Sequence, residues 1–195
     1  MGTGVELGTP RERLLETANR LFYAEGVHTV GIDRILAEAG VAKASLYKTF
    51  GSKDGLVAAY LESRHARTVE RLSAAVAGVT DPRERLTAIF DSQAALFARP
   101  DYRGCAFVAA SAETTGAVTG DSPVEEASAA YRSWVQGLFL GIATDAGAAD
   151  PETLARRLQL VYDGSAVAAR MDRDPAIGAD ARASALRLFD DAIGR

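Results

Sequence analysis

Apolar residues in this chain recur at helical spacing, three and four positions apart, from its first segments onward. Thr9-Pro10-Arg11-Glu12 has the pattern of a capping box with proline in the first turn, and the apolar run that follows stops at Gly26. The same spacing predicts a helix at about 32–39, ended by Gly40, and a third at about 42–50. The first fifty residues therefore predict three helices, the last two of them short.

Turn signals divide the remainder into longer helical segments, and none of it alternates as a strand does. We predict helices over about 53–77, from 82 onward, and over about 105–115, 124–145, 151–171 and 179–193. Residues 116–123 are rich in glycine and polar side chains and are predicted to be a connector. The pattern as a whole predicts an all-α protein of about nine helices.

Composition agrees with helices and excludes several classes of protein. The 195 residues include 38 alanines, the strongest helix former, and a single cysteine, which excludes an internal disulfide framework and a cysteine-rich zinc site. The two histidines have no metal-ligand spacing, and no glycine-rich phosphate loop or nucleophile motif is present. We expect no metal, no cofactor and no catalytic residue. No apolar run is long enough for a membrane span and no signal pattern begins the chain, so we expect a cytoplasmic protein.

The net charge of −4 is unevenly distributed along the chain. Residues 1–80 carry 10 Lys+Arg against 9 Asp+Glu, which leaves 12 against 17 for residues 81–195. All three lysines lie between positions 43 and 53, and no carboxylate occurs from residue 39 to residue 53. An acidic total argues weakly against nucleic acid as a partner, but this local excess of cations suits an anionic one.

Two short helices that meet at Gly40, preceded by a supporting helix, have the pattern of a helix-turn-helix. In the third helix Leu46 and Phe50 are the apolar positions that would attach it to its support. The remaining side chains can project outward into a DNA major groove, and they are Lys43, Ala44, Ser45, Tyr47, Lys48 and Thr49. For the lysines alone, the competing interpretation is a solvated helix face.

The run TVGIDRILAEAGVAKASLYKTFGSKDGLVAAYL resembles the N-terminal domain of the TetR (tetracycline-repressor-like) transcriptional regulators. The resemblance implies a helix-turn-helix DNA-binding domain over residues 1–54, a linking helix at about 53–77, and an effector-binding and dimerisation domain over residues 55–195. It also implies a regulator, most often a repressor, that binds a palindromic operator as a homodimer and is released by a small-molecule effector.

Carried over by position, the resemblance assigns DNA contacts to particular residues. Lys43, Ala44 and Ser45 would face the groove, and Tyr47 and Lys48 would touch phosphates or base edges. Thr29 and Lys53 would contact phosphates at the two flanks. The chain departs from the family pattern at four positions, which are Ala42 for a capping serine, Ala44 for glycine, Thr49 for histidine and Gly51 for proline.

Family members also dimerise through their last two long helices. Small and apolar residues recur along both of these predicted helices here, at Leu154, Leu158, Val161, Ser165 and Ala168, and at Ala181, Ala185, Leu188 and Ala192. Such stripes let helix pairs approach closely, and we expect them to form the dimer contact. Packing within one chain is the alternative.

An effector cavity among the C-terminal helices is the remaining implication. The candidate lining residues are Phe90, Gln93, Phe97, Phe107, Tyr131, Trp134, Leu138 and Tyr162. Ordinary core packing is the alternative for each of them. The scarcity of charge on these apolar faces favours a mainly apolar, aromatic or cationic effector.

Cys105 follows Arg103 by two residues at the start of a predicted helix. A helix N-terminus and a nearby cation both lower the pKa of a thiol, so Cys105 is a candidate redox sensor, against the alternative of a small buried hydrophobe. A DNA-binding adaptor controlled by a protein partner or by this thiol is thus an alternative to a ligand-gated regulator.

Overall fold

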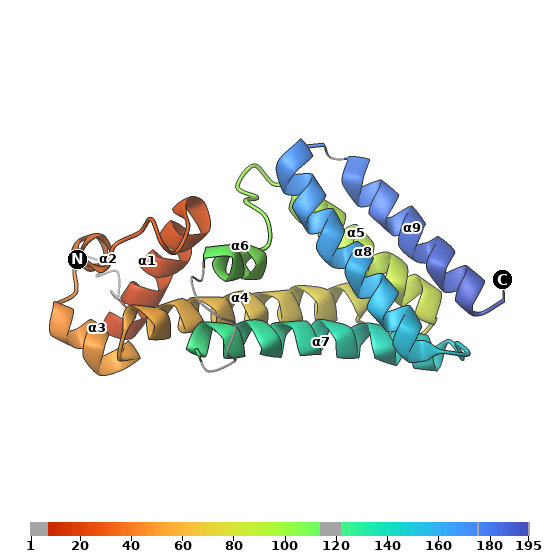
Figure 1. The fold of residues 1–195 in the computed structure, drawn as a ribbon, viewed down its shortest axis with the longest axis horizontal. Helices are drawn as coiled ribbons and strands as arrows, with labels where there is room; N and C mark the ends of the chain where they lie inside the picture. The colour runs from red at the N-terminus through yellow and green to blue at the C-terminus, as the bar shows by residue number, and fades with distance from the viewer. Residues whose placement is uncertain (1–7, 114–121, 175, 195) are drawn as a thin grey trace, which may run out of the picture. The chain divides into compact units, whose positions relative to one another are not determined.

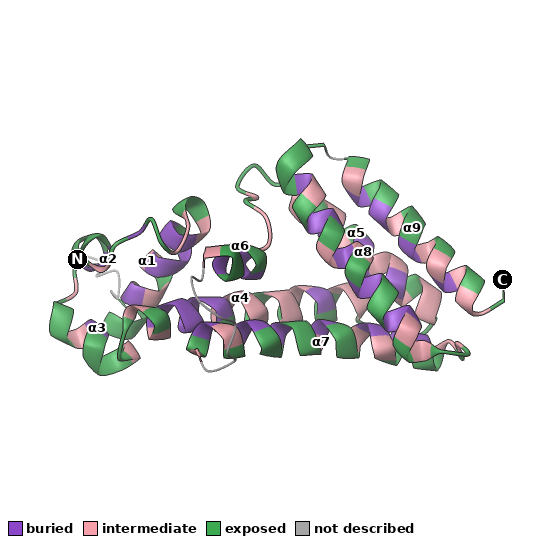
Figure 2. Ribbon diagram, viewed as in Figure 1, coloured by how far each residue is buried: buried purple, intermediate pink, exposed green. Residues whose placement is uncertain are grey.

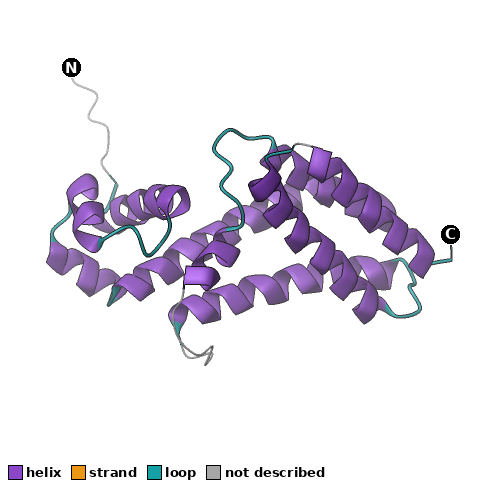
Figure 3. Cartoon of the chain, turned by 45° about the horizontal axis from the view of Figure 1, so that its top comes forward, coloured by secondary structure: helices purple, strands orange, loops and turns teal. Residues whose placement is uncertain are grey.

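The computed structural model describes residues 8–113, 122–174 and 176–194, and within these ranges the chain forms only helices and loops (Figure 3). The helices are α1 (Pro10–Glu25), α2 (Ile32–Ala39), α3 (Lys43–Phe50), α4 (Lys53–Val76), α5 (Pro82–Phe97), α6 (Ala106–Glu113), α7 (Pro123–Asp145), α8 (Pro151–Asp172) and α9 (Ala176–Ala192). The predicted all-α fold is confirmed. Most of the predicted connector at 116–123 lies outside the described residues. No helix in the described ranges is long and apolar enough to cross a membrane.

Local chemistry fixes the first helix boundaries. The Thr9 hydroxyl accepts a hydrogen bond from the Glu12 N–H at 3.3 Å, and the Glu12 carboxylate accepts one from the Thr9 N–H at 2.7 Å, which completes the predicted capping box. Gly26 ends α1 with φ at +94°. Gly40 ends α2 in the left-handed conformation that glycine adopts without a steric penalty.

The chain divides into two compact units. The first contains the described residues of Met1–Arg64 and Ala106–Ser128, and so holds α1 to α3, the beginning of α4, and α6. Here α1 packs against both α2 and α3 (Figure 1). The ribbon of these helices is purple in Figure 2 where residues are buried, and the fully buried residues of this core include Leu14, Leu21, Ile35, Leu46 and Leu56. The domain boundary at residue 54 stays a prediction.

The second unit contains His65–Cys105 and Ala129–Arg195. In it α5, α8 and α9 pack against one another (Figure 1). Ion pairs join α5 to α9 at Arg83 and Asp190, where Nε and Oδ1 are 2.8 Å apart, and at Arg182 and Asp91, 2.6 Å apart. The core of this unit is more aromatic, and its fully buried side chains include Leu86, Ile89, Phe90, Phe139, Leu158 and Phe189.

The last helix begins three residues before the predicted start at 179. Asp174 accepts a hydrogen bond from the Ala176 N–H at 2.8 Å, which caps the helix early. Gly178 then lies inside the first turn, buried against α5, where a Cβ would come within 2.5 Å of the Ala94 Cβ. The prediction began the helix after this glycine because glycine is a poor helix former. Close packing against α5 is what places it inside the helix.

Candidate functional site

The helix assigned to DNA contact, α3, is attached to its unit along one side only. Leu46 is fully buried, and Phe50 is half-buried with the Arg11 guanidinium 5.8 Å from its ring centroid. Ser45 is half-buried, and the other predicted groove-facing residues are exposed: Lys43, Ala44, Tyr47, Lys48 and Thr49. The Tyr47 side chain is 45% exposed, although large aromatic residues usually lie in a core. The helix therefore presents one continuous mixed polar and aromatic face to solvent.

The turn before α3 is fixed by a side chain from α1. Arg13 donates to the carbonyl oxygen of Ala39 from Nε at 2.9 Å and from Nη2 at 2.6 Å, and Nη2 also donates to the carbonyl oxygen of Gly40. A cation at the C-terminus of α2 also suits the helix dipole. Our sequence reasoning missed Arg13 because its partners lie 26 and 27 positions further along the chain. No local motif signals such a contact.

The three lysines have different surroundings. The Lys43 Nζ lies 3.3 Å from Asp33 Oδ1 in an ion pair whose side chains are 61% and 88% exposed, and such pairs contribute little to stability. Lys43 can therefore exchange Asp33 for another anion. Lys48 and Lys53 make no ion pair with any residue that the structure describes. Lys53 opens α4, where its side chain is half-buried.

The flanks of α3 are also ordered. The Ser52 hydroxyl accepts a hydrogen bond from the Gly55 N–H at 3.0 Å and so caps α4 directly beside Lys53. At the other flank Thr29 is exposed and is followed by the fully buried Val30. The structure thus puts Thr29 and Lys53 at the surface of the same unit as α3, as contact with flanking phosphates requires. Their contact with DNA stays a prediction.

An ion-pair network at the surface of the same unit joins α1 to α2. The Arg34 guanidinium donates to both carboxylate oxygens of Glu25, at 2.6 and 2.8 Å, and to Glu38 at 2.9 Å. Arg20 donates to Glu38 as well. Hydrogen bonds from Arg34 and Arg20 hold the pKa of Glu25 and of Glu38 below their ordinary values. Both carboxylates therefore stay ionised at neutral pH and bind arginine side chains of their own unit.

The residues proposed for an effector cavity lie in both units. One group is a buried aromatic cluster in which the Tyr162 ring centroid lies 6.1 Å from Phe90 and 5.7 Å from Phe139. Gln93 belongs to it, since its Nε2 donates to the Tyr162 carbonyl oxygen at 2.9 Å and its Oε1 accepts from the Ser165 hydroxyl at 3.2 Å. These contacts are those of a closed core.

Tyr131 is connected to this cluster, because its side chain is hydrogen-bonded to that of Tyr162. Tyr131 and Trp134 surround His65, with ring centroids 5.7 and 5.5 Å away, and burial lowers the pKa of His65. Leu138 is half-buried on α7, whereas Phe107 is buried in α6 of the first unit. Phe107 thus lies in a different unit from the other seven candidates, and the role of all eight as effector contacts stays a prediction.

Sequence reasoning also missed a polar cluster in the second unit. Arg71 donates to the Ser92 hydroxyl at 2.7 Å, and its Nη2 lies 3.5 Å from the Tyr162 hydroxyl. Burial raises the pKa of Tyr162 and that of Tyr131, so both phenols stay protonated at neutral pH. The cluster joins α4, α5 and α8, and only the tertiary fold brings its members together.

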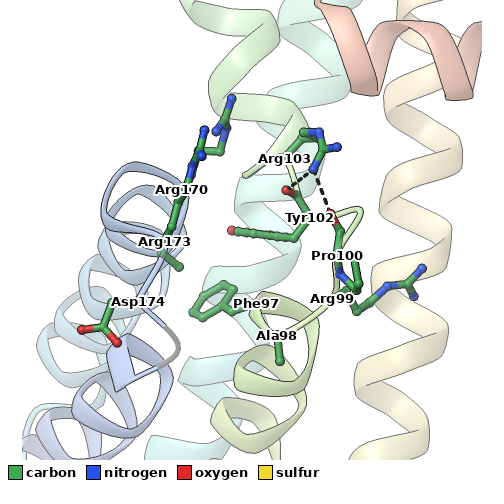
Figure 4. A pocket seen from close by; sticks show the side chains of 10 residues that line it. Phe97, Ala98, Arg99, Pro100, Tyr102, Arg103, Arg170, Arg173 and Asp174 are labelled. Atoms are coloured by element: carbon green, nitrogen blue, oxygen red, sulfur yellow. Dashed lines mark hydrogen bonds between the residues drawn. The ribbon is translucent and has the colours of Figure 1, made fainter.

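The surroundings of Cys105 differ in part from those expected. Cys105 is half-buried and directly precedes α6, as predicted. The Arg103 guanidinium, however, donates to the carbonyl oxygens of Pro100 and Tyr102, 3.0 Å away in each case (Figure 4). That nitrogen is thus directed at the backbone before the cysteine, and redox sensing by Cys105 stays a prediction.

The stripes expected to form a dimer contact lie mostly inside the chain. Leu154 and Leu158 of α8 and Ala185 of α9 are at most 2% exposed, in the part of the unit where α5, α8 and α9 pack together. Four other stripe residues are half-buried, namely Val161, Ala168, Leu188 and Ala192. The expectation was wrong for Leu154, Leu158 and Ala185 because the spacing that suits a dimer also suits packing between helices of one chain. The large apolar side chains left exposed on α8 are Leu160 (65%), Val167 (39%) and Met171 (76%).

The fold and the exposed face of α3 define a helix-turn-helix protein, and comparisons with known proteins agree. The family described as "Bacterial regulatory proteins, tetR family" matches residues 14–60, which span α1 to the first part of α4. The crystal structure of a TetR-family transcriptional regulator from Streptomyces coelicolor is 34% identical, covers 94% of this chain and 96% of its own, and superposes with a TM-score of 0.86. A tetR-type transcriptional regulator of Streptomyces avermitilis is 33% identical over 96% of this chain and 99% of its own, with a TM-score of 0.84.

A curated relative from Mycobacterium tuberculosis, an uncharacterised HTH-type transcriptional regulator, is 33% identical over 75 residues. That match covers 38% of this chain and 37% of the relative, so it spans little more than a third of the curated protein. The similarity to the two solved structures, in contrast, extends over nearly their full length. The chain belongs to the TetR family of transcriptional regulators. It is a regulator with a helix-turn-helix DNA-binding unit rather than an enzyme.

Proposed function

We propose that this protein is a ligand-responsive repressor that acts in the cytoplasm as a homodimer on a palindromic DNA operator. The observation that carries the proposal is the exposed face of α3, in which Tyr47 and Lys48 project from a helix attached through Leu46. Two such helices, held roughly 34–36 Å apart by a dimer, would enter successive major grooves on one side of the duplex.

The charges on and around α3 support contact with phosphates. No carboxylate occurs from residue 39 to residue 53, and Lys48 and Lys53 are not paired with any described carboxylate. Lys48 would contact the backbone from the helix itself, while Lys53 and Thr29 would contact it from the flanks. Ala44 offers a methyl group that suits contact with a thymine methyl. Ser45 and Thr49 offer hydroxyl groups that can donate or accept.

The exposed apolar face of α8 supports dimerisation. Leu160, Val167 and Met171 are separated by seven and four residues, which puts them on one side of the helix. Gly164 lies in the same stripe, and a Cβ built on it meets no atom within 4 Å. A second copy of the chain would bury this stripe in a four-helix bundle made of two helices from each protomer.

The effector would act through α4, which begins at Lys53 and continues to Val76. A small molecule bound among the C-terminal helices would shift α4 and change the spacing between the two α3 helices in the dimer. We expect a coupling of about 1–3 kcal/mol between effector and operator, which is the ordinary range for such linkage.

DNA binding is tested with Lys48→Gln and Tyr47→Ala. DNA fragments that the wild-type protein retains in a selection from random sequence supply the operator. We expect each substitution to weaken operator binding by about tenfold or more, and Lys48→Gln to lower the salt slope by about one if Lys48 binds a single phosphate. The matched control is Arg187→Gln, which removes a positive charge from a side chain that is 80% exposed on α9.

Unchanged affinity and salt slope in folded Lys48→Gln and Tyr47→Ala proteins would overturn the DNA assignment. The sign of regulation is tested with a reporter gene placed behind a selected fragment. Lower expression when the protein is supplied supports repression, and higher expression would replace the repressor by an activator.

The dimer is tested by sedimentation of wild type and Leu160→Glu at micromolar concentration with operator present. We expect a dimer for wild type and a monomer for the variant, because a dimer would bury the introduced carboxylate without a partner. A wild-type monomer bound to operator would contradict the proposal. Thermal-shift screening with small molecules tests the effector, since a bound ligand raises the Tm of the folded state.

A further inference from the structure

A cavity of about 610 Å³ opens in the second unit, between the end of α5 with its following loop and the C-terminal end of α8 (Figure 4). Its volume is in the range that holds drug-sized ligands. Four of its ten lining residues are arginines, and the only carboxylate among the ten is Asp174. Asp174 is already engaged as the cap of α9, where it accepts the Ala176 N–H at 2.8 Å.

Two of these arginines, Arg170 and Arg173, make no ion pair with any described residue. Arg99, in contrast, is paired with Asp101, with 2.9 Å between Nη2 and Oδ2. Figure 4 shows Arg99 directed away from Arg170 and Arg173. Arg103, on the same side as Arg99, donates to the carbonyl oxygens of Pro100 and Tyr102. The two lining arginines for which no ion pair or hydrogen bond to a described residue is found both lie on the α8 side of the cavity.

Both arginines are exposed, and each has a distinctive local setting. Arg173 has φ at +54°, the single positive φ among the described non-glycine residues, in the left-handed conformation that glycine adopts most readily. Gly104 lies against the stem of Arg170, and a Cβ there would come within 3.2 Å of the Arg170 Cγ. Cations at a helix C-terminus also suit the helix dipole, but the dipole explains neither the strained backbone nor the packed stem.

An aromatic pair, Phe97 and Tyr102, also lines the cavity next to these arginines (Figure 4). The rings of Phe97 and Tyr102 lie 5.2 Å apart between centroids at an interplanar angle of 50°. The Tyr102 hydroxyl donates to the Ala166 carbonyl oxygen of α8 at 2.9 Å, which fixes the ring beside the helix that carries the arginines. The cavity thus combines an aromatic pair, of which the Tyr102 ring is fixed to α8, with two exposed arginines from the C-terminal end of the same helix.

We propose that this cavity binds an organic anion, with its carboxylate, sulfonate or phosphate group on Arg170 and Arg173 and its aromatic or apolar part on Phe97 and Tyr102. Guanidinium groups bind such anions through paired, charge-assisted hydrogen bonds. If the protein is the ligand-responsive regulator proposed above, organic anions become its effector class. The sequence alone had favoured an apolar, aromatic or cationic effector.

The binding test uses two fluorescent probes that differ by one charged group. 8-Anilino-1-naphthalenesulfonate carries a sulfonate, and N-phenyl-1-naphthylamine is its neutral counterpart. We expect the Arg170→Gln/Arg173→Gln double variant to bind the sulfonate at least about tenfold more weakly than wild type, and the neutral probe within twofold of wild type. The matched control, Arg67→Gln/Arg187→Gln, removes two exposed positive charges elsewhere in the same unit and should bind both probes as wild type does.

A third variant separates binding from stability. Glycine relaxes the left-handed backbone at position 173, so Arg173→Gly should keep the wild-type Tm and still bind the sulfonate more weakly. Equal affinity of wild type and the double variant for the sulfonate would overturn the site. An equal loss in the Arg67→Gln/Arg187→Gln control would also overturn it, because the effect would then be one of net charge.

A DNA-binding measurement distinguishes failure of the anion site from failure of the proposed regulatory function. With a selected operator fragment, saturating sulfonate should weaken DNA binding by wild type and leave Arg170→Gln/Arg173→Gln unaffected. Sulfonate binding that depends on the two arginines but does not change DNA affinity supports the anion site and contradicts its role as the effector site.

Discussion

Both units of this chain pair arginines with carboxylates across helices, but they differ in which cationic side chains remain outside such pairs. In the second unit arginines join helices through carboxylates, as Arg83 joins Asp190 and Arg182 joins Asp91. In the first unit Arg13 binds backbone carbonyls, while Lys48 and Lys53 make no ion pair with a described residue. The net charge of −4 is a sum over paired and unpaired side chains and does not distinguish them. Whether a chain can bind an anion therefore depends on which of its cationic side chains lack a carboxylate partner. The net charge of the whole chain does not contain that information.

The largest effects should come from glycines at close contacts, one in each unit. A Cβ on Gly55 would overlap the Phe50 carbonyl oxygen at the end of α3, and a Cβ on Gly178 would come within 2.5 Å of the Ala94 Cβ. We expect Gly55→Ala to cost about 3 kcal/mol of unfolding free energy and Gly178→Ala about 1–2 kcal/mol. Denaturant unfolding measures both. Gly55→Ala should also weaken DNA binding, whereas equal loss of DNA binding in both variants would argue against separate roles for the units.

The next largest loss of unfolding free energy is expected when the Arg13 side chain is removed. Arg13→Leu should cost about 1.5 kcal/mol, because it removes charge-assisted hydrogen bonds to the carbonyls of Ala39 and Gly40. It should lower DNA affinity without changing the salt slope, since Arg13 fixes the turn and does not contact phosphate. Arg182→Leu, which breaks a half-exposed pair in the second unit, should cost about 0–1 kcal/mol and leave DNA binding unchanged. A lower salt slope in Arg13→Leu would instead make Arg13 a phosphate contact.

A substitution at Gly137 is expected to raise the unfolding free energy slightly instead of lowering it. This residue lies within α7, and a Cβ built on it meets nothing within 4 Å. Gly137→Ala should therefore raise the unfolding free energy by about 0.5–1 kcal/mol, the difference in helix propensity between the two residues. Measured beside Gly178→Ala, it separates the cost of close packing from the general effect of adding a methyl group.

The smallest expected effects are changes of the unfolding free energy with pH, and the two units are affected over different pH ranges. Burial lowers the pKa of His65 below 6.5, so the unfolded chain binds a proton more readily than the folded second unit does. The neutral, half-buried His65 therefore makes its full contribution to the free energy of unfolding above about pH 6.5. That contribution is lost as the pH falls towards the lowered pKa of His65 in the folded protein. The pKa values of Glu25 and Glu38 are lowered from 4.5, so their contribution to the first unit is lost only below about pH 4.5. Unfolding followed from pH 8 to 3 should show both windows, and His65→Gln should remove the upper one alone.

The sequence was most informative where the determining contacts are short in range. The capping box at Thr9 and Glu12, the glycine that ends α2 and the beginning of α5 at Pro82 all depend on residues within one helical turn. The start of α9 was missed because Gly178 owes its place in the helix to Ala94, a residue 84 positions earlier. Leu154, Leu158 and Ala185 were misassigned to a dimer contact for a related reason, since helical spacing identifies a buried face without identifying which helix covers it.

By itself the sequence determined the helices, the turn at Gly40, the family resemblance and the face of α3 that carries Tyr47 and Lys48. Local hydrogen bonding and side-chain spacing are enough to encode these features. The tertiary structure decided that Arg13 fixes the turn, that Leu160, Val167 and Met171 are the apolar residues left exposed on α8, and that Arg170 and Arg173 share a cavity with Phe97 and Tyr102. Each of these depends on residues far apart in the chain, and only packing brings such residues together.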